Sequence, residues 1–132
     1  MSDDRLTAAE VRAIREGLGV TAEWLANHLG VQTRTVQRWE SGQSAVKPFA
    51  VAAIRRLEAH AEEEVRRLTE AYLRDGSKHA VLFIEAGGVD SVQDAPMSGL
   101  RAMVEDGPSG WQRMIAFRVR QQIPGLRIID TP

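Results

Sequence analysis

The chain has 132 residues, a formal net charge of −1 and no cysteine. This length suits one domain or two very small ones, and a charged fraction of 27% indicates a globular chain and not a disordered one. Without cysteine there is no disulfide framework and no thiolate zinc site. No apolar run approaches the ~20 residues of a membrane span, and the polar start Met1-Ser2-Asp3-Asp4-Arg5 is unlike a signal peptide. We therefore expect a cytoplasmic protein with no membrane partner.

The first 75 residues carry helical periodicity throughout. Thr7 and Glu10 have the spacing of a capping box, in which each side chain satisfies a backbone amide of the other residue, so a helix is expected to begin here. Three further helical segments are expected, over residues 21–29, 32–41 and 48–74. The last of them can break in two near Glu62–Glu64. The sequence therefore predicts a compact five-helix domain over residues 1–75.

The second and third of these helices flank a glycine-centred turn. The second helix carries three residues on its buried side: Leu25, Ala26 and Leu29. Gly30 stands where the chain needs a residue that tolerates positive φ, and Val36 and Trp39 lie three apart on the buried side of the third helix. The outer side of that helix shows four polar residues, none of them acidic: Thr33, Arg34, Gln37 and Arg38. A short helix with such a face, held by a tight turn, has the shape that fits a DNA major groove.

The charge distribution agrees with this prediction. From Val31 to Arg56 the chain has five basic residues and one acidic residue, Glu40, which is a local net charge of +4. From residue 57 to residue 75 it has three basic and six acidic residues. Positive charge is thus gathered around the third helix, as a compact duplex footprint requires. We expect Glu40 to pair with an arginine of the first helix, Arg12 or Arg15, and not to act as a catalyst.

The character of the chain changes after Asp75-Gly76-Ser77, a stop signal that predicts a domain boundary. The segments expected beyond it are a strand over residues 80–84, a loop over 87–94, a short helix from Pro96 or Ser98 through Val104, a helix from Ser109 that ends at Pro124-Gly125, and a strand over 126–129. The later helix has apolar residues at core spacing, with Phe117 as a further candidate: Trp111, Met114, Ile115 and Val119. So small an α+β module buries little surface alone, which favours dimerisation. The candidate dimer contacts are Phe83, Ile84, Trp111, Ile115 and Ile128.

Several segments together resemble the Cro/repressor, or xenobiotic-response-element, helix-turn-helix family over about residues 7 to 60. They are Val20-Thr21, Leu25-Ala26, Leu29-Gly30-Val31, Thr35-Val36 and Arg38-Trp39-Glu40-x-Gly42. The segment through Ser44-Ala45-Val46, the long following helix, a strand and the late Gly110-Trp111 helix are also similar to the two-domain anti-CRISPR-associated autorepressors of phages and mobile elements. That resemblance implies a homodimer that binds an inverted repeat and represses its own operon.

Carried over by position, the resemblance implies that the outer side of the third helix faces the bases: Thr33, Arg34, Gln37 and Arg38. Arginine can form two hydrogen bonds with guanine, and glutamine can do the same with adenine, so Arg34 and then Gln37 are the expected base readers. Ala22 stands where many relatives have a glutamine that contacts the first base pair. The resemblance therefore implies that Arg34 reads this base pair instead. The residues expected to contact the DNA backbone are Thr21, Thr35, Gln43, Ser44 and Lys47.

The sequence therefore predicts a mainly α protein, with a helix-turn-helix DNA-binding domain over residues 1–75 and a small α+β dimerisation domain over 76–132. No catalytic residue, cofactor or metal is expected, because His28, His60 and His79 lie on separate elements without metal-ligand spacing. Two rival functions stay open: an antitoxin-like regulator whose C-terminal module binds a protein partner, and a sensor whose module binds a small molecule. An RNA partner also stays open.

Overall fold

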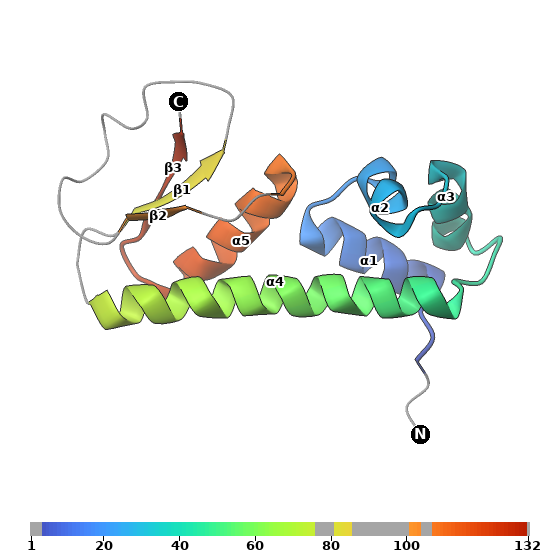
Figure 1. Cartoon of the computed structure of the whole chain (residues 1–132), viewed down its shortest axis with the longest axis horizontal. Helices are drawn as coiled ribbons and strands as arrows, with labels where there is room; N and C mark the ends of the chain where they lie inside the picture. Colours follow the sequence, from blue (N-terminus) through green and yellow to red (C-terminus); the bar gives the residue numbers. More distant parts are fainter. Residues whose placement is uncertain (1–3, 76–80, 86–100, 104–106, 132) are drawn as a thin grey trace. The chain divides into compact units, whose positions relative to one another are not determined.

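A computed structural model describes residues 4–75, 81–85, 101–103 and 107–131 (Figure 1). The chain divides into two units, residues 1–60 and 61–132. The division falls inside helix α4 (Pro48–Asp75), which contributes residues to both units. The boundary that we predicted after residue 75 falls at the end of that helix and not at the division between the two units.

Unit 1 contains α1 (Ala8–Leu18), α2 (Ala22–Leu29), α3 (Thr33–Ser41) and the first part of α4. The expected capping box opens α1: the Glu10 amide donates to Thr7 Oγ1 at 3.1 Å, and the Thr7 amide donates to Glu10 Oε1 at 3.0 Å. These contacts with Thr7 lower the pKa of Glu10, because they stabilise the carboxylate. Thr21 caps α2 by accepting a hydrogen bond from the Trp24 amide at 3.0 Å. Thus Thr7 and Thr21 are the N-caps of the first two helices, as the sequence predicted.

The turn between α2 and α3 depends on Gly30. Its φ of 72° lies in the left-handed region, and its amide donates to the carbonyls of Ala26 and Asn27. A Cβ atom at this glycine would meet no atom within 4 Å, so the requirement comes from the backbone conformation and not from crowding. The predicted role of Gly30 is confirmed.

The core of unit 1 joins all four of its helical segments. The buried side chains include Val11, Leu18, Leu25, Ala26, Val36, Trp39, Val51 and Ile54. Leu29, predicted to be buried, is only half-buried. Figure 1 shows α3 beside α1 and α2, with which it is in contact. The buried faces of α2 and α3 therefore lie where their helical spacing places them.

Helix α4 runs without interruption for 28 residues, so residues 4–75 contain four helices and not the five that we predicted. Ion pairs one turn apart support the stretch where a break was expected: Glu63 with Arg66, Glu64 with Arg67, and Arg66 with Glu70. Ala61, Glu64 and Leu68 are also buried along this stretch. With α5 (Ser109–Gln122) as a further helix, the fold is mainly α, as predicted.

Unit 2 pairs the rest of α4 and α5 with a parallel three-stranded sheet of order β2-β1-β3. The strands are β1 (Val81–Glu85), β2 (Arg101–Met103) and β3 (Arg127–Thr131). In this register Phe83 lies opposite Met103 in β2 and Ile129 in β3. The helix predicted through Val104 is wrong at residues 101–103, because this segment pairs with β1 as an edge strand. The predicted loop over 87–94 lies outside the described residues.

Helix α5 packs on β1 and β3 (Figure 1). Its buried side contains Trp111, Ile115 and Val119, as predicted, whereas Phe117 is 55% exposed and is not a core residue. Tyr72 of α4 donates a hydrogen bond from its hydroxyl to the Val81 carbonyl and so joins the helix to the sheet. In the described part of the chain, every helix is too short or too polar to cross a membrane.

Candidate nucleic-acid interface

The outer side of α3 forms a shallow depression. It is lined by Arg34, Gln37, Arg38, Ser41 and Gln43. Every one of these residues is exposed, and none carries a carboxylate. Within the described ranges, neither Arg34 nor Arg38 has an ion-pair partner. Both guanidinium groups are therefore available to an anionic ligand.

The buried side of α3 determines which residues this surface presents. Val36 is 0% exposed and Trp39 is 2% exposed, which leaves Arg34, Gln37 and Arg38 on the solvent side. Thr33 was predicted to face the bases, but it is half-buried and does not line the depression. Three of the four predicted base-reading residues thus lie together.

Ser41 belongs to this surface although we did not predict it. It lies four residues after Gln37, a spacing that places both on one side of the helix, so helical geometry would have found it. Its hydroxyl donates to the Arg38 carbonyl at 3.2 Å.

The acidic residue of α3 is turned away from this surface. Glu40 accepts two hydrogen bonds from Arg15 of α1, from Nε at 2.8 Å and from Nη2 at 2.9 Å. Arg15 also donates from Nη1 to the Val20 carbonyl at 3.1 Å. The hydrogen bond with Glu40 raises the pKa of Arg15. The predicted pairing is confirmed with Arg15 and not Arg12, and it ties α3 to α1 and to the segment before α2.

The residues predicted to contact the DNA backbone lie at helix ends. Thr21 is the exposed N-cap of α2, Thr35 is half-buried in the first turn of α3, and Lys47 is exposed just before α4. Gln43 and Ser44 are exposed after α3, and their amides donate to the Arg38 carbonyl at 2.9 and 3.3 Å. Of these residues only Gln43 lines the depression with the base-reading candidates.

The first turn of α3 is a further place where backbone amides can bind an anion. Its N-cap, Gln32, makes no capping hydrogen bond through its side chain, and the turn contains no acidic residue. The amides at the start of a helix carry partial positive charge and are suited to phosphate oxygens. Ala22, in the first turn of α2, is half-buried and offers no polar side chain.

The predicted dimer contacts in unit 2 lie mostly in its own core. Ile84, Trp111 and Ile115 are 6%, 4% and 0% exposed, so they hold this unit together and present almost no surface to another chain. Ile128 is half-buried, and the side chain of Phe83 lies outside the described residues. Apolar residues at helical spacing occur both in the core of a unit and in an interface between chains. The sequence pattern alone therefore did not distinguish the two.

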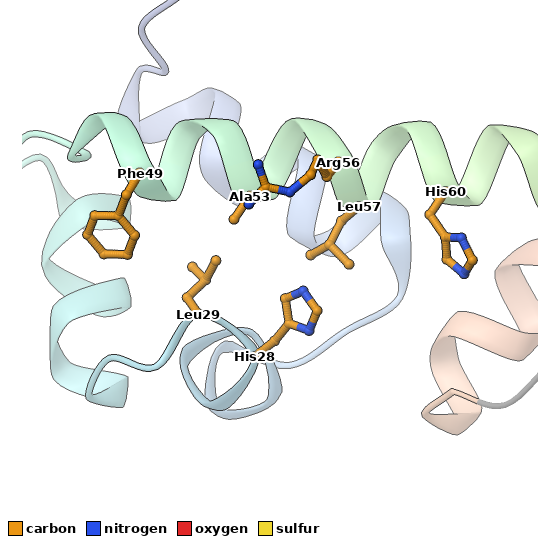
Figure 2. A pocket seen from close by; sticks show the side chains of 7 residues that line it. All are labelled: His28, Leu29, Phe49, Ala53, Arg56, Leu57 and His60. Carbon is orange, nitrogen blue, oxygen red and sulfur yellow. The ribbon is translucent and has the colours of Figure 1, made fainter.

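Unit 1 has a second hollow of about 480 Å³ between α2 and α4 (Figure 2). Its lining consists of His28, Leu29, Phe49, Ala53, Arg56, Leu57 and His60, and it shares no residue with the α3 surface. The Trp24 ring stacks on His28, with centroids 5.0 Å apart. Trp24 is half-buried on α2. The hollow is therefore a separate surface whose lining mixes apolar side chains with His28, Arg56 and His60.

Comparison with known proteins supports the interpretation of α2 and α3. Residues 7–82 match the model of a family described as a helix-turn-helix domain, a span of more than half of the chain. No curated protein matches the sequence.

Proposed function

Because the chain belongs to the helix-turn-helix domain family, we propose that it is a sequence-specific transcriptional repressor. In this proposal α3 enters the major groove, Arg34 and Gln37 read base edges, and Arg38 reads a base or contacts a phosphate. The protein occludes a promoter, which the resemblance to phage autorepressors suggests is its own. The proposal assigns no reaction, cofactor or metal to the chain.

The observation that carries the proposal is the α3 surface itself. Arg34, Gln37 and Arg38 are exposed together, and the acidic Glu40 is paired with Arg15 and does not line the depression. Arginine and glutamine have the donors and acceptors for bidentate contacts with guanine and adenine. A surface that served only for solubility would be expected to mix both signs of charge.

We further propose that two copies bind an inverted repeat. Two α3 helices on one face of a duplex need half-sites about one turn, or roughly 34 Å, apart. The small sheet supports this part of the proposal, because its edge strand β3 has backbone groups that are not paired within the described sheet. Ile128 of β3 is also half-buried and not fully enclosed. Ile84, Trp111 and Ile115 are buried within unit 2, so they are not part of this proposed interface.

Selection of bound sites from random duplexes tests the proposal directly. The full chain should enrich an inverted repeat with half-sites about one turn apart. Arg34→Ala should weaken binding by about 1–3 kcal/mol and relax the preference at one base pair of each half-site. The matched control is Arg74→Ala, which removes an exposed arginine from the end of α4.

The outcomes separate the parts of the proposal. Enrichment of a single, unrepeated site would contradict the dimer while keeping sequence-specific binding. Equal binding of selected and scrambled duplexes by the Arg34→Ala variant and by the unmodified chain would contradict the assignment of Arg34.

A further inference from the structure

Helix α5 of unit 2 has an exposed side of unusual composition. The exposed residues of this helix are Ser109, Arg113, Phe117, Arg120, Gln121 and Gln122. Helix α5 contains no carboxylate at all. Neither Arg113 nor Arg120 has an ion-pair partner within the parts of the chain that the structure describes. Among the described residues, nothing pairs with the positive charge of this side, although the whole chain has a net charge of −1.

Among the described helices, only α3 shares this composition. Its exposed residues are likewise arginine, glutamine and serine, without a carboxylate. Helices α1, α2 and α4 all expose glutamate, for example Glu10, Glu23 and Glu63. Carboxylates repel phosphate, whereas arginine and glutamine bind phosphates and base edges. The chemistry of α5 thus matches that of the proposed DNA-binding surface and not that of an ordinary solvated helix.

Phe117 distinguishes α5 from α3. It is 55% exposed, and it lies four residues after Arg113 and three before Arg120. This spacing places the three side chains on one side of the helix. At about 1.5 Å per residue, Phe117 is roughly 6 Å from Arg113 and roughly 4.5 Å from Arg120 along the axis. An apolar ring therefore lies between two arginines that have no ion-pair partner among the described residues, a set that we call the Arg–Phe–Arg stripe.

Arg118 is not part of this stripe. It is half-buried and lines a furrow that it shares with Glu62 and Glu70 of α4. Neither Arg113 nor Arg120 lines this furrow.

Charge argues against a second copy of α5 as the occupant of this face. Antiparallel pairing of two α5 helices about Phe117 would bring Arg113 of one copy near Arg120 of the other, and like charges across an interface are costly. An intact duplex also makes little use of the Phe117 ring, because its bases are already stacked on each other. A single strand offers unstacked bases and phosphates on the same chain.

We propose that the Arg–Phe–Arg stripe binds single-stranded nucleic acid, independently of the α3 surface. Phe117 stacks on one base, and Arg113 and Arg120 bind the flanking phosphates. Binding by this stripe depends on the backbone and on stacking, so it tolerates many sequences.

The test uses the full chain and a labelled oligothymidylate of about 12 nucleotides, with oligouridylate of equal length to compare the two sugars. Binding is measured by fluorescence anisotropy with and without saturating operator duplex. Phe117→Ala should weaken binding of the single strand by roughly 5- to 150-fold, and Phe117→Trp should restore it. Arg113→Gln with Arg120→Gln should reduce the salt slope by about 1.4, since each phosphate contact of a single strand contributes about 0.7.

Two matched controls come from α4 of the same unit. Leu73→Ala truncates another exposed apolar side chain, 64% exposed, and Arg74→Gln removes another exposed arginine. Neither control should change the affinity for the single strand. The stripe variants should leave operator affinity unchanged, so failure of this proposal and failure of the proposed repressor function are distinguishable.

Three results would overturn the proposal. The first is the absence of single-strand binding by the full chain, which would leave an acidic protein as the partner that suits the stripe. The second is displacement of the single strand by operator duplex, which would show that the two ligands do not bind independently. The third is an equal loss of affinity for Phe117→Ala and Leu73→Ala.

Discussion

The Arg15–Glu40 pair should stabilise unit 1 by more than an ordinary surface salt bridge does. Exposed pairs contribute about 0–1 kcal/mol, whereas removal of one partner from a buried pair costs about 3–5 kcal/mol, because the other charge is left uncompensated. The two side chains here are 18% and 12% exposed and share hydrogen bonds of 2.8 and 2.9 Å. We therefore expect Glu40→Gln to lower the free energy of unfolding by about 2–3 kcal/mol, just below the buried limit.

Urea titration followed by tryptophan fluorescence and circular dichroism measures this loss. Trp39 is adjacent to Glu40 and only 2% exposed, so its emission should report the unfolding of this part of the core. Arg15→Met and the double variant complete a double-mutant cycle, in which the coupling energy should exceed about 1 kcal/mol. The matched control is Glu63→Gln, because Glu63 and Arg66 form an exposed pair whose side chains are 59% and 57% exposed.

The comparison between Glu40→Gln and Glu63→Gln tests whether burial strengthens an ion pair in this protein. Glu63→Gln should lower the free energy of unfolding much less than Glu40→Gln does, because solvent screens an exposed pair. If Glu40→Gln costs no more than this control, burial does not strengthen the pair. In that case Arg15 does not hold α3 in place.

Three other predictions follow from contacts described above. Lys47→Ala should weaken binding to all duplexes alike and reduce the slope of log affinity against log salt by about 0.9; an unchanged slope would count against a phosphate contact. Because the contacts with Thr7 lower the pKa of Glu10, the stability that its charge contributes is present above about pH 4 and is lost as the pH falls through the lowered value. The free energies of unfolding of Glu10→Gln and the unmodified chain should therefore differ at pH 7 and converge near pH 2, and a difference that did not depend on pH would contradict this. Gly107→Ala should cost about 1–3 kcal/mol, because its Cβ would lie 2.7 Å from Cδ1 of the buried Trp111, whereas Gly17→Ala, with nothing within 4 Å, should be neutral or stabilising in a thermal melt.

Local signals were sufficient to predict most of unit 1. The capping box at Thr7, the cap at Thr21 and the turn at Gly30 each depend on residues within one helical turn, so the sequence contains all the necessary information. The choice between Arg12 and Arg15 as the partner of Glu40 was different. It depends on how α1 packs against α3. Arg12 and Arg15 lie about one helical turn apart on α1, and side-chain periodicity does not decide between them.

Contacts between distant segments explain what could not be predicted. Residues 101–103 have no strand pattern of their own, and they become a strand only by pairing with β1. Likewise, apolar spacing in α5 predicts a buried side but not what buries it. Trp111 and Ile115 therefore looked the same as interface residues, although they fill the core of their own unit.

The length of α4 has a consequence for how the protein can be divided. Because the helix crosses from residue 60 to residue 61 without a break, no linker separates the units. A fragment that ended at residue 60 would stop in mid-helix, and the complementary fragment would begin there without a cap. We therefore expect limited proteolysis of the native protein to spare this junction, and neither unit to fold well when it is expressed without the other.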